Sequence, residues 1–270
     1  GLYRAPTDEA LRYDIEVTKK LGYNMARKHV KVEPARWYYW CDKLGLLVWQ
    51  DMPNGDEPIG PNQPDLERSK KSAQQYETEL LEMLDQFGNH PSIICWVPFN
   101  EGWGQFDTER ITNLIKNTDP SRLVNSASGW ADRNVGDMHD IHAYPGPEIP
   151  EPEEKRAIVL GEFGGLGLPI EGYTWQSSDN WGYRNYKNRE ELKAAYIDLI
   201  RRLQGMISKG LSAAVYTQTT DVEVEVNGLM TYDREIIKIE PKNMQRINKG
   251  YLPPVFYSTG EIFLNSTKVE

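Results

Sequence analysis

The 270 residues carry 31 Lys and Arg against 40 Asp and Glu, a formal net charge of −9 at pH 7. This acidic balance argues against a nucleic-acid partner, because binding the phosphate backbone requires a basic surface. No apolar run approaches the roughly 20 residues that span a bilayer, so we expect no membrane partner either. An apolar fraction of 39% and a charged fraction of 26% are typical of a globular protein and exclude a disordered or collagen-like chain.

Cysteine and tryptophan are the informative minor residues. Cys41 and Cys95 are too few for a disulfide framework or for a structural zinc site with four ligands, and we expect both to be buried small apolar side chains. The 8 Trp residues are an unusual excess. Flat rings with a polar edge suit both a large core and the apolar face of a sugar.

The chain opens with an alternation of helix and strand. A Thr cap, two acids in the first turn and a closing Gly22 predict a helix from about Thr7 to Leu21. A short strand over residues 23–27 and a second helix from near Pro34 to Gly45 follow. Residues 46–51 form an apolar run that ends in polar residues, as expected of a strand buried on both faces.

The same alternation continues to the C-terminal region. A long amphipathic helix over about 66–87 leads into a strand at 93–97. We expect further strands at 123–125, 140–143, 158–160 and 211–215, further helices at about 107–117 and 189–208, and loops at 52–64, 146–154 and 164–188. Loops longer than about 12 to 15 residues are usually functional or disordered, and the last of these is rich in Trp and Tyr.

Seven short strands in this order suit two architectures, an open doubly wound sheet or an eight-stranded barrel of about 250 residues. A doubly wound nucleotide-binding fold would carry a G-x-G-x-x-G turn or a P-loop after an early strand, and neither motif is present. The sequence therefore predicts an α/β fold, a (β/α)₈ TIM barrel over residues 1–250 that is one strand short. Residues 251–270 are expected to form a C-terminal tail.

Polar residues stand at the carboxyl ends of nearly all the expected strands, where a barrel places its active site. They are Arg27, His29, Gln50, Asp51, Asn100, Glu101, His142, Tyr144 and Glu162. Glu101 and Glu162 stand out because each ends a buried strand, where a charge is costly without a partner or a task.

A facing pair of carboxylates is what glycoside hydrolysis requires. One, held protonated, donates a proton to the leaving oxygen, and the other, ionised, attacks or stabilises the oxocarbenium-like carbon. A structural interpretation is equally compatible with the spacing: Glu101 as a first-turn helix acid beside an Asn cap, and Glu162 in a salt bridge with an Arg. Spacing alone leaves the two interpretations open.

Several segments add a family resemblance, in a consistent order along the chain. They are Leu11–Glu16, Leu21–His29, Cys41–Val48, His90–Ile93, Asn100–Glu101 and Gly161–Gly164. Over about residues 8–236 the sequence resembles the barrel domain of glycoside hydrolase family 2, which includes β-galactosidases, β-glucuronidases and β-mannosidases. If the strand at 23–27 is the second of eight, Glu101 follows the fourth and Glu162 ends the seventh, as in the family. The missing strand is then the first, expected before Gly1.

The resemblance implies a role for each candidate residue. It makes Glu101 the acid/base and Glu162 the nucleophile of a retaining β-glycosidase. The expected substrate contacts are Asn100 to the sugar 2-hydroxyl, Tyr144 beside the nucleophile, and His29 and Asp51 lining the sugar site. His142 is either a sugar contact or a satisfied core residue. Trp103, Trp175 and Trp181 are candidates for a platform on which a sugar ring stacks.

Other features limit the assignment. Residues 138–142 contain two histidines and an Asp, but on a strand His139 and Asp140 face opposite sides, so we expect no metal and no cofactor. Phe99 stands where family members often carry Gly, and residues 164–181 match no particular subgroup. The sugar therefore stays open.

We expect a retaining β-glycosidase that acts on a carbohydrate substrate at its non-reducing end. The alternative is a non-catalytic carbohydrate-binding or structural fragment of a larger glycosidase, since family members place β-sandwich domains before the barrel. The resemblance implies such N-terminal domains in the parent protein. A periplasmic or extracellular location is the corresponding expectation.

Overall fold

The computed structural model describes residues 4–253, 256–258 and 261–263. All seven expected strands are found, in the expected order: β1 (Met25–Lys28), β2 (Leu47–Asp51), β3 (Ile93–Val97), β4 (Leu123–Val124), β5 (Met138–Ala143), β6 (Ala157–Gly164) and β9 (Leu211–Thr217). They form two parallel sheets, one with the order β1-β2-β3-β4 and one with the order β5-β6-β9.

In the described part of the chain, six helices accompany the strands, and five of them were expected. They are α1 (Asp8–Lys20), α2 (Ala35–Leu44), α3 (Lys70–Phe87), α4 (Thr108–Thr118), α5 (Arg189–Ile207) and α6 (Pro241–Asn248). The expected Thr7 cap is present, because its hydroxyl accepts a hydrogen bond from the backbone N–H of Ala10. The long helix predicted from residue 66 begins instead at Lys70, because Ser69 caps it and the N–H of Leu66 bonds to Gln105.

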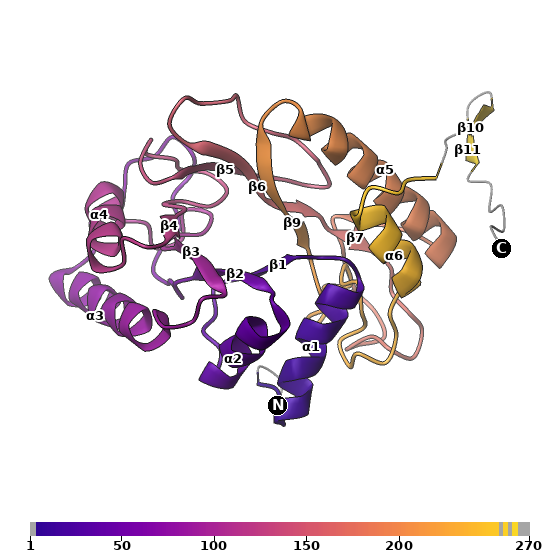
Figure 1. Ribbon diagram of the computed structural model, residues 1–270, viewed down its shortest axis with the longest axis horizontal. Coiled ribbons are helices and arrows are strands. Elements are labelled where there is room, and N and C mark those ends of the chain that lie inside the picture. The colour runs from indigo at the N-terminus through magenta and orange to yellow at the C-terminus, as the bar shows by residue number, and fades with distance from the viewer. Residues whose placement is uncertain (1–3, 254–255, 259–260, 264–270) are drawn as a thin grey trace.

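The two sheets lie in the middle of the molecule with helices outside them (Figure 1). Helices α1 to α4 accompany the four-stranded sheet, and α5 and α6 lie on the other side of the molecule. Loops rather than helices join β4 to β5 and β5 to β6. Between the sheets, the N–H of Asp137 donates to the carbonyl of Val124 at 2.8 Å.

Within the described residues, no strand pairing joins β9 to β1. The chain is therefore an α/β protein with two parallel sheets, while closure into eight strands and a strand before Gly1 remain predictions. Residues 164–188, expected to be a loop, contain the short strands β7 (Leu166–Gly167) and β8 (Arg184–Asn185), which pair in parallel.

The C-terminal segment adds one short antiparallel pair, β10 (Phe256–Ser258) with β11 (Glu261–Phe263). Part of the predicted tail, residues 254–255, 259–260 and 264–270, lies outside the described residues, as do residues 1–3. The division at residue 250 remains a prediction. None of the helices in the described ranges is long and apolar enough to cross a membrane.

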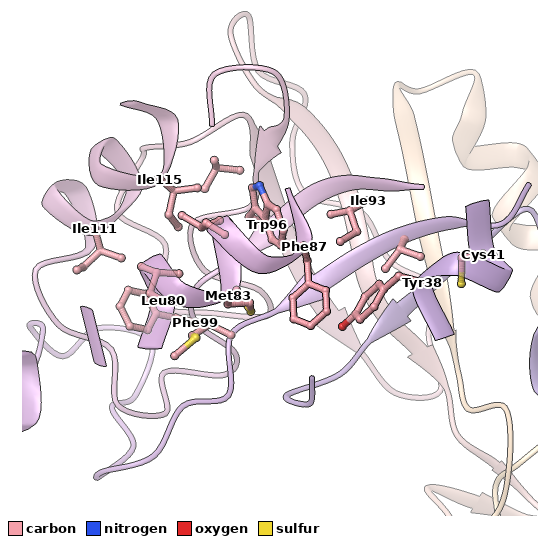
Figure 2. Packing of buried hydrophobic residues seen from close by; sticks show 14 of the residues in the cluster. Tyr38, Cys41, Leu80, Met83, Phe87, Ile93, Trp96, Phe99, Ile111 and Ile115 are labelled. Atoms are coloured by element: carbon pink, nitrogen blue, oxygen red, sulfur yellow. The ribbon is translucent and has the colours of Figure 1, made fainter. Parts of the chain in front are cut away.

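Of the three hydrophobic clusters in the described residues, the two larger ones pack helices against the sheets. The first packs α2, α3 and α4 against the four-stranded sheet, and Figure 2 shows its large rings, among them Tyr38, Phe87, Trp96 and Phe99. The second packs α5 and α6 against β6 and β9. Both cysteines are buried, as expected, and burial raises the pKa of the Cys41 thiol to about 12.

Candidate active site

A buried arginine, Arg27 on β1, lies at the centre of the polar residues that end the strands. Its guanidinium binds Asp51 through two nearly parallel hydrogen bonds of 3.0 and 2.8 Å, and it donates to Asn100 Oδ1 at 2.7 Å. It also contacts Glu162 Oε1 at 3.2 Å and His142 Nε2 at 3.3 Å. The forked donor geometry of Arg therefore connects β1 and β2 with β5 and β6 at one point.

The two glutamates singled out by the sequence do come together. Oxygens of Glu101 and Glu162 and a ring nitrogen of His142 all lie within 4.8 Å of one another. The two acids differ in environment, since Glu162 is 12% exposed and ion-paired to Arg27, whereas Glu101 is 26% exposed. Two carboxyl groups about 5 to 5.5 Å apart are the spacing of retaining glycosidases.

Glu101 lies just beyond β3 on a strained turn. Its φ of 52° is in the left-handed region that residues other than Gly rarely adopt, and its N–H donates to Ser128 at 2.9 Å. Such strain persists only where the surroundings hold it, and it concentrates at functional sites. Burial raises the pKa of the Glu101 carboxyl, against the opposing charges of His29 and Arg27. This environment favours the protonated acid.

Glu162, near the end of β6, is held by a tyrosine on its other oxygen. The hydroxyl of Tyr144 donates to Glu162 Oε2 at 2.5 Å, while Thr217 Oγ1 lies 2.9 Å from the same hydroxyl. Burial and the charge of Glu162 raise the pKa of Tyr144, so it stays a donor at any working pH. The expected place of Tyr144 beside Glu162 agrees with this geometry.

His142 on β5 lies between the two acids. Arg27 Nη1 lies 3.3 Å from Nε2, and Ser128 Oγ, which donates to Asp140 Oδ2, lies 2.8 Å from the same nitrogen. Nδ1 is 2.9 Å from Glu101 Oε1 and 3.4 Å from Glu162 Oε2. Burial lowers the pKa of His142 to about 4, so the ring is neutral at neutral pH and is a hydrogen-bonded part of the site.

Two further expected sugar contacts, His29 and Asp51, differ in their exposure to solvent. His29 is 58% exposed, and its Nε2 lies 3.3 Å from the Asn100 amide and 3.5 Å from Glu162. The Asp51 side chain is 1% exposed, and Arg27 together with the N–H of Val30 occupies its oxygens. Asp51 therefore lies beneath the site as a support for Arg27, and its contact with a sugar remains a prediction.

The expected platform of tryptophans is only partly connected to these acids. Trp181 packs edge-on against Tyr183, which stacks on Tyr144 with ring centroids 3.7 Å apart. Trp175 packs instead against Tyr232. Trp103, three residues after Asn100, is exposed and forms a backbone bridge with Pro58. The connected aromatic wall is therefore Tyr144, Tyr183 and Trp181.

A group of potential metal ligands lies near the start of β5, with His139 on the strand and two acids in the loops on either side of it. Asp132, His139 and Glu153 bring ligand atoms within 4.8 Å of one another. Arg156 already forms ion pairs with both carboxylates of this group, at 2.7 and 2.6 Å. Its positive charge opposes binding of a cation there.

The family can be assigned from the sequence comparison. Residues 4–160 match the model described as glycosyl hydrolases family 2, TIM barrel domain. This chain belongs to family 2. The curated relatives of the domain include a β-galactosidase of Vibrio cholerae, 28% identical over 58% of this chain, and a putative β-glucuronidase of Formosa agariphila, 27% identical over 70% of it. The family 2 domain spans 17% of the length of each of these two relatives.

Solved structures show the same fold. The β-galacturonidase of Eisenbergiella tayi bound to galacturonate is 19% identical, with a TM-score of 0.65 over 91% of this chain and 48% of that one. The β-glucuronidase 2 of Bacteroides uniformis, covalently bound to cyclophellitol-6-carboxylate aziridine, is 17% identical, with a TM-score of 0.66 over 93% of this chain and 34% of that one.

Sequence reasoning did not assign a role to three residues at the site of the family 2 domain. Arg27 was noted at a strand end, but no motif indicates that it contacts so many of the site residues. Thr217 ends β9, and its contact with Tyr144 depends on strands that are far apart in sequence. Glu225 lies in a polar loop after β9, where an acid has no distinguishing local signal.

Proposed function

We propose that the family 2 domain is the catalytic domain of a retaining β-glycosidase, with Glu162 as nucleophile and Glu101 as acid/base. The observation that carries this proposal is the approach of the two carboxylates within 4.8 Å in unlike environments. Glu162 accepts hydrogen bonds from Arg27 and Tyr144, while burial raises the pKa of Glu101. Different environments give two carboxyl groups different pKa values, so that one site can provide both an acid and a base.

The reaction would proceed in two displacements. Glu101 gives its proton to the glycosidic oxygen as Glu162 Oε attacks the anomeric carbon, so the leaving group departs neutral and a glycosyl ester forms. Glu101, now ionised, takes a proton from water, which attacks the same carbon and releases Glu162. Arg27 and Tyr144 stabilise the carboxylate that departs in this second step.

The names of the relatives leave the substrate class open. One is called a β-galactosidase and another a putative β-glucuronidase, which differ in whether the sugar carries a charge. The activity of the whole protein is part of this proposal, as are the roles of Asn100 and His29 in binding the sugar.

The test is a panel of aryl β-glycosides hydrolysed by the full-length protein. Glu162→Gln should lower kcat by at least about 10³-fold, because a carboxamide cannot form the glycosyl ester. Glu154→Gln, a change of an exposed acid just before β6, should leave kcat unchanged. NMR of the first product should show the β-anomer. An α-anomer, or undiminished turnover by Glu162→Gln, would contradict the mechanism, and a protein that binds glycosides without hydrolysing them would support the non-catalytic alternative.

A further inference from the structure

A third acid, Glu225, lies in the loop after β9 and is held by hydrogen bonds. The Asn227 amide donates to Glu225 Oε1 at 2.8 Å, and the Gln218 amide donates to Asn227 Oδ1 at 2.6 Å. Gln218 directly follows Thr217, whose hydroxyl lies 2.9 Å from that of Tyr144. Side-chain hydrogen bonds through Asn227 and Gln218, and the backbone from Gln218 to Thr217, therefore connect the half-buried Glu225 to Tyr144, which contacts the candidate nucleophile.

The backbone around Glu225 is anchored to the aromatic wall. The N–H of Val226 donates to the carbonyl of Trp181 at 2.8 Å, and the N–H of Trp181 donates to Val224 at 2.9 Å. Trp181 packs on Tyr183, which stacks on Tyr144. Glu225 is thus positioned by two independent sets of contacts, as a residue that recognises a ligand needs to be.

The surroundings of Glu225 are negatively charged. Burial raises its pKa, the charge of Glu162 raises it further, and the charge of His29 opposes this. In the part of the chain that the structure describes, no ion pair joins Glu225 to Lys or Arg. Within the described residues, Glu225 therefore has no ion-pair partner that would compete with a ligand.

Arg27 cannot receive an acidic substrate. All five N–H groups of Arg27 are directed at protein acceptors: Asp51, Asn100, His142, Gly161 and Glu162. Its side chain is 1% exposed. A sugar carboxylate would meet Glu162 and Glu225 without a free guanidinium, and like charges without a partner are strongly unfavourable.

We propose that Glu225 is a specificity-determining residue that accepts hydrogen bonds from hydroxyl groups of a neutral hexopyranoside and rejects sugar acids. This inference rests on the proposed glycosidase function and narrows its substrate class. Hydroxyl groups can donate to a carboxylate, and such charge-assisted hydrogen bonds are stronger than neutral ones.

The experiment compares kcat/KM of the full-length protein for p-nitrophenyl β-D-galactoside and β-D-glucoside with that for the matching β-D-galacturonide and β-D-glucuronide. The wild type should prefer the better neutral glycoside by at least about 100-fold. Glu225→Gln should lower kcat/KM for that neutral glycoside roughly tenfold or more and narrow the preference by a similar factor, because the negative charge is lost. Glu171→Gln, a change of an exposed acid in the loop region after β6, is the matched control and should alter neither value.

The outcomes separate the two proposals. Turnover of the sugar acids as fast as the neutral glycosides by the wild type would overturn the role of Glu225 while leaving the glycosidase function standing. An unchanged preference in a folded Glu225→Gln protein would do the same. Absence of turnover on every glycoside would overturn the proposed function itself and this inference with it. The wild-type ratio of kcat/KM between neutral glycosides and sugar acids tests the proposal even where Glu225→Gln fails to fold.

Discussion

His142 lies between the two candidate catalytic acids, and its ring is neutral. Its side chain is 2% exposed, and its Nε2 lies 3.3 Å from Arg27 while its Nδ1 lies 2.9 Å from Glu101. A protonated imidazole would bury a second positive charge beside that of Arg27. The protein therefore binds this histidine in its uncharged form.

This arrangement predicts a pH dependence of stability. The pKa of His142 is about 4 in the folded protein against an ordinary 6.5, so between those values only the unfolded chain takes up the proton. Unfolding free energy from this group falls as pH falls from 6.5 to 4, by about 3 kcal/mol in all. Asp140 acts in the opposite direction, because burial raises its pKa to about 6 and the folded protein takes up that proton first.

Replacing His142 separates its effect on stability from that of Asp140. His142→Gln lacks the group whose protonation in the unfolded chain destabilises the wild type at low pH. When the pH is lowered from 7 to 4.5, the unfolding free energy of the variant should therefore rise by about 2 to 3 kcal/mol relative to that of the wild type. Urea unfolding at the two pH values measures this difference. A difference in stability between the proteins that is the same at both pH values would show that His142 is not held neutral.

At the scale of elements, α3 illustrates what a periodic pattern determines. Its buried residues Tyr76, Leu80, Met83, Leu84 and Phe87 recur at helical spacing and face the four-stranded sheet, as Figure 2 shows for Leu80, Met83 and Phe87. The pattern predicted the helix and its end. It placed the start too early, because Leu66 is also apolar but is held by a backbone hydrogen bond to Gln105 outside the helix.

Two neighbouring leucines on α3 test the packing. Leu80 is fully buried and Leu81 is 38% exposed, so the same substitution has different consequences. Leu80→Ala should destabilise the protein by about 3 to 5 kcal/mol, through lost burial and a cavity, whereas Leu81→Ala should cost less than about 1 kcal/mol. Thermal or urea unfolding measures both, and equal losses would refute the assigned face of the helix.

At the scale of the molecule, Arg27 joins the two sheets. It reaches from β1 to Asp51 on β2 within the four-stranded sheet, and to His142 and Glu162 in the three-stranded sheet. Because Arg27 and Asp51 are both 1% exposed, neither charge has water as an alternative partner. The polar centre of the site is therefore also a structural connection between the two halves.

Arg27→Met tests this connection. It leaves the Asp51 carboxylate buried without its partner, which typically costs about 3 to 5 kcal/mol of unfolding free energy. Arg12→Met removes the exposed pair with Glu16 and should cost less than about 1 kcal/mol. Denaturant unfolding of both variants measures the contrast, and similar small losses would show that the network does not hold the sheets together.

The sequence by itself determined the order of the strands and most helices, the two glutamates and the family, because periodicity and motifs are properties of neighbouring residues. The closeness of Glu101 and Glu162 followed only from the assumed fold. The tertiary structure decided the rest. Arg27 meets His142 and Glu162 across 115 and 135 residues of sequence, and Glu225 reaches the site through Asn227 and Gln218. Such contacts depend on how strands pack side by side, and no local pattern of the chain encodes them.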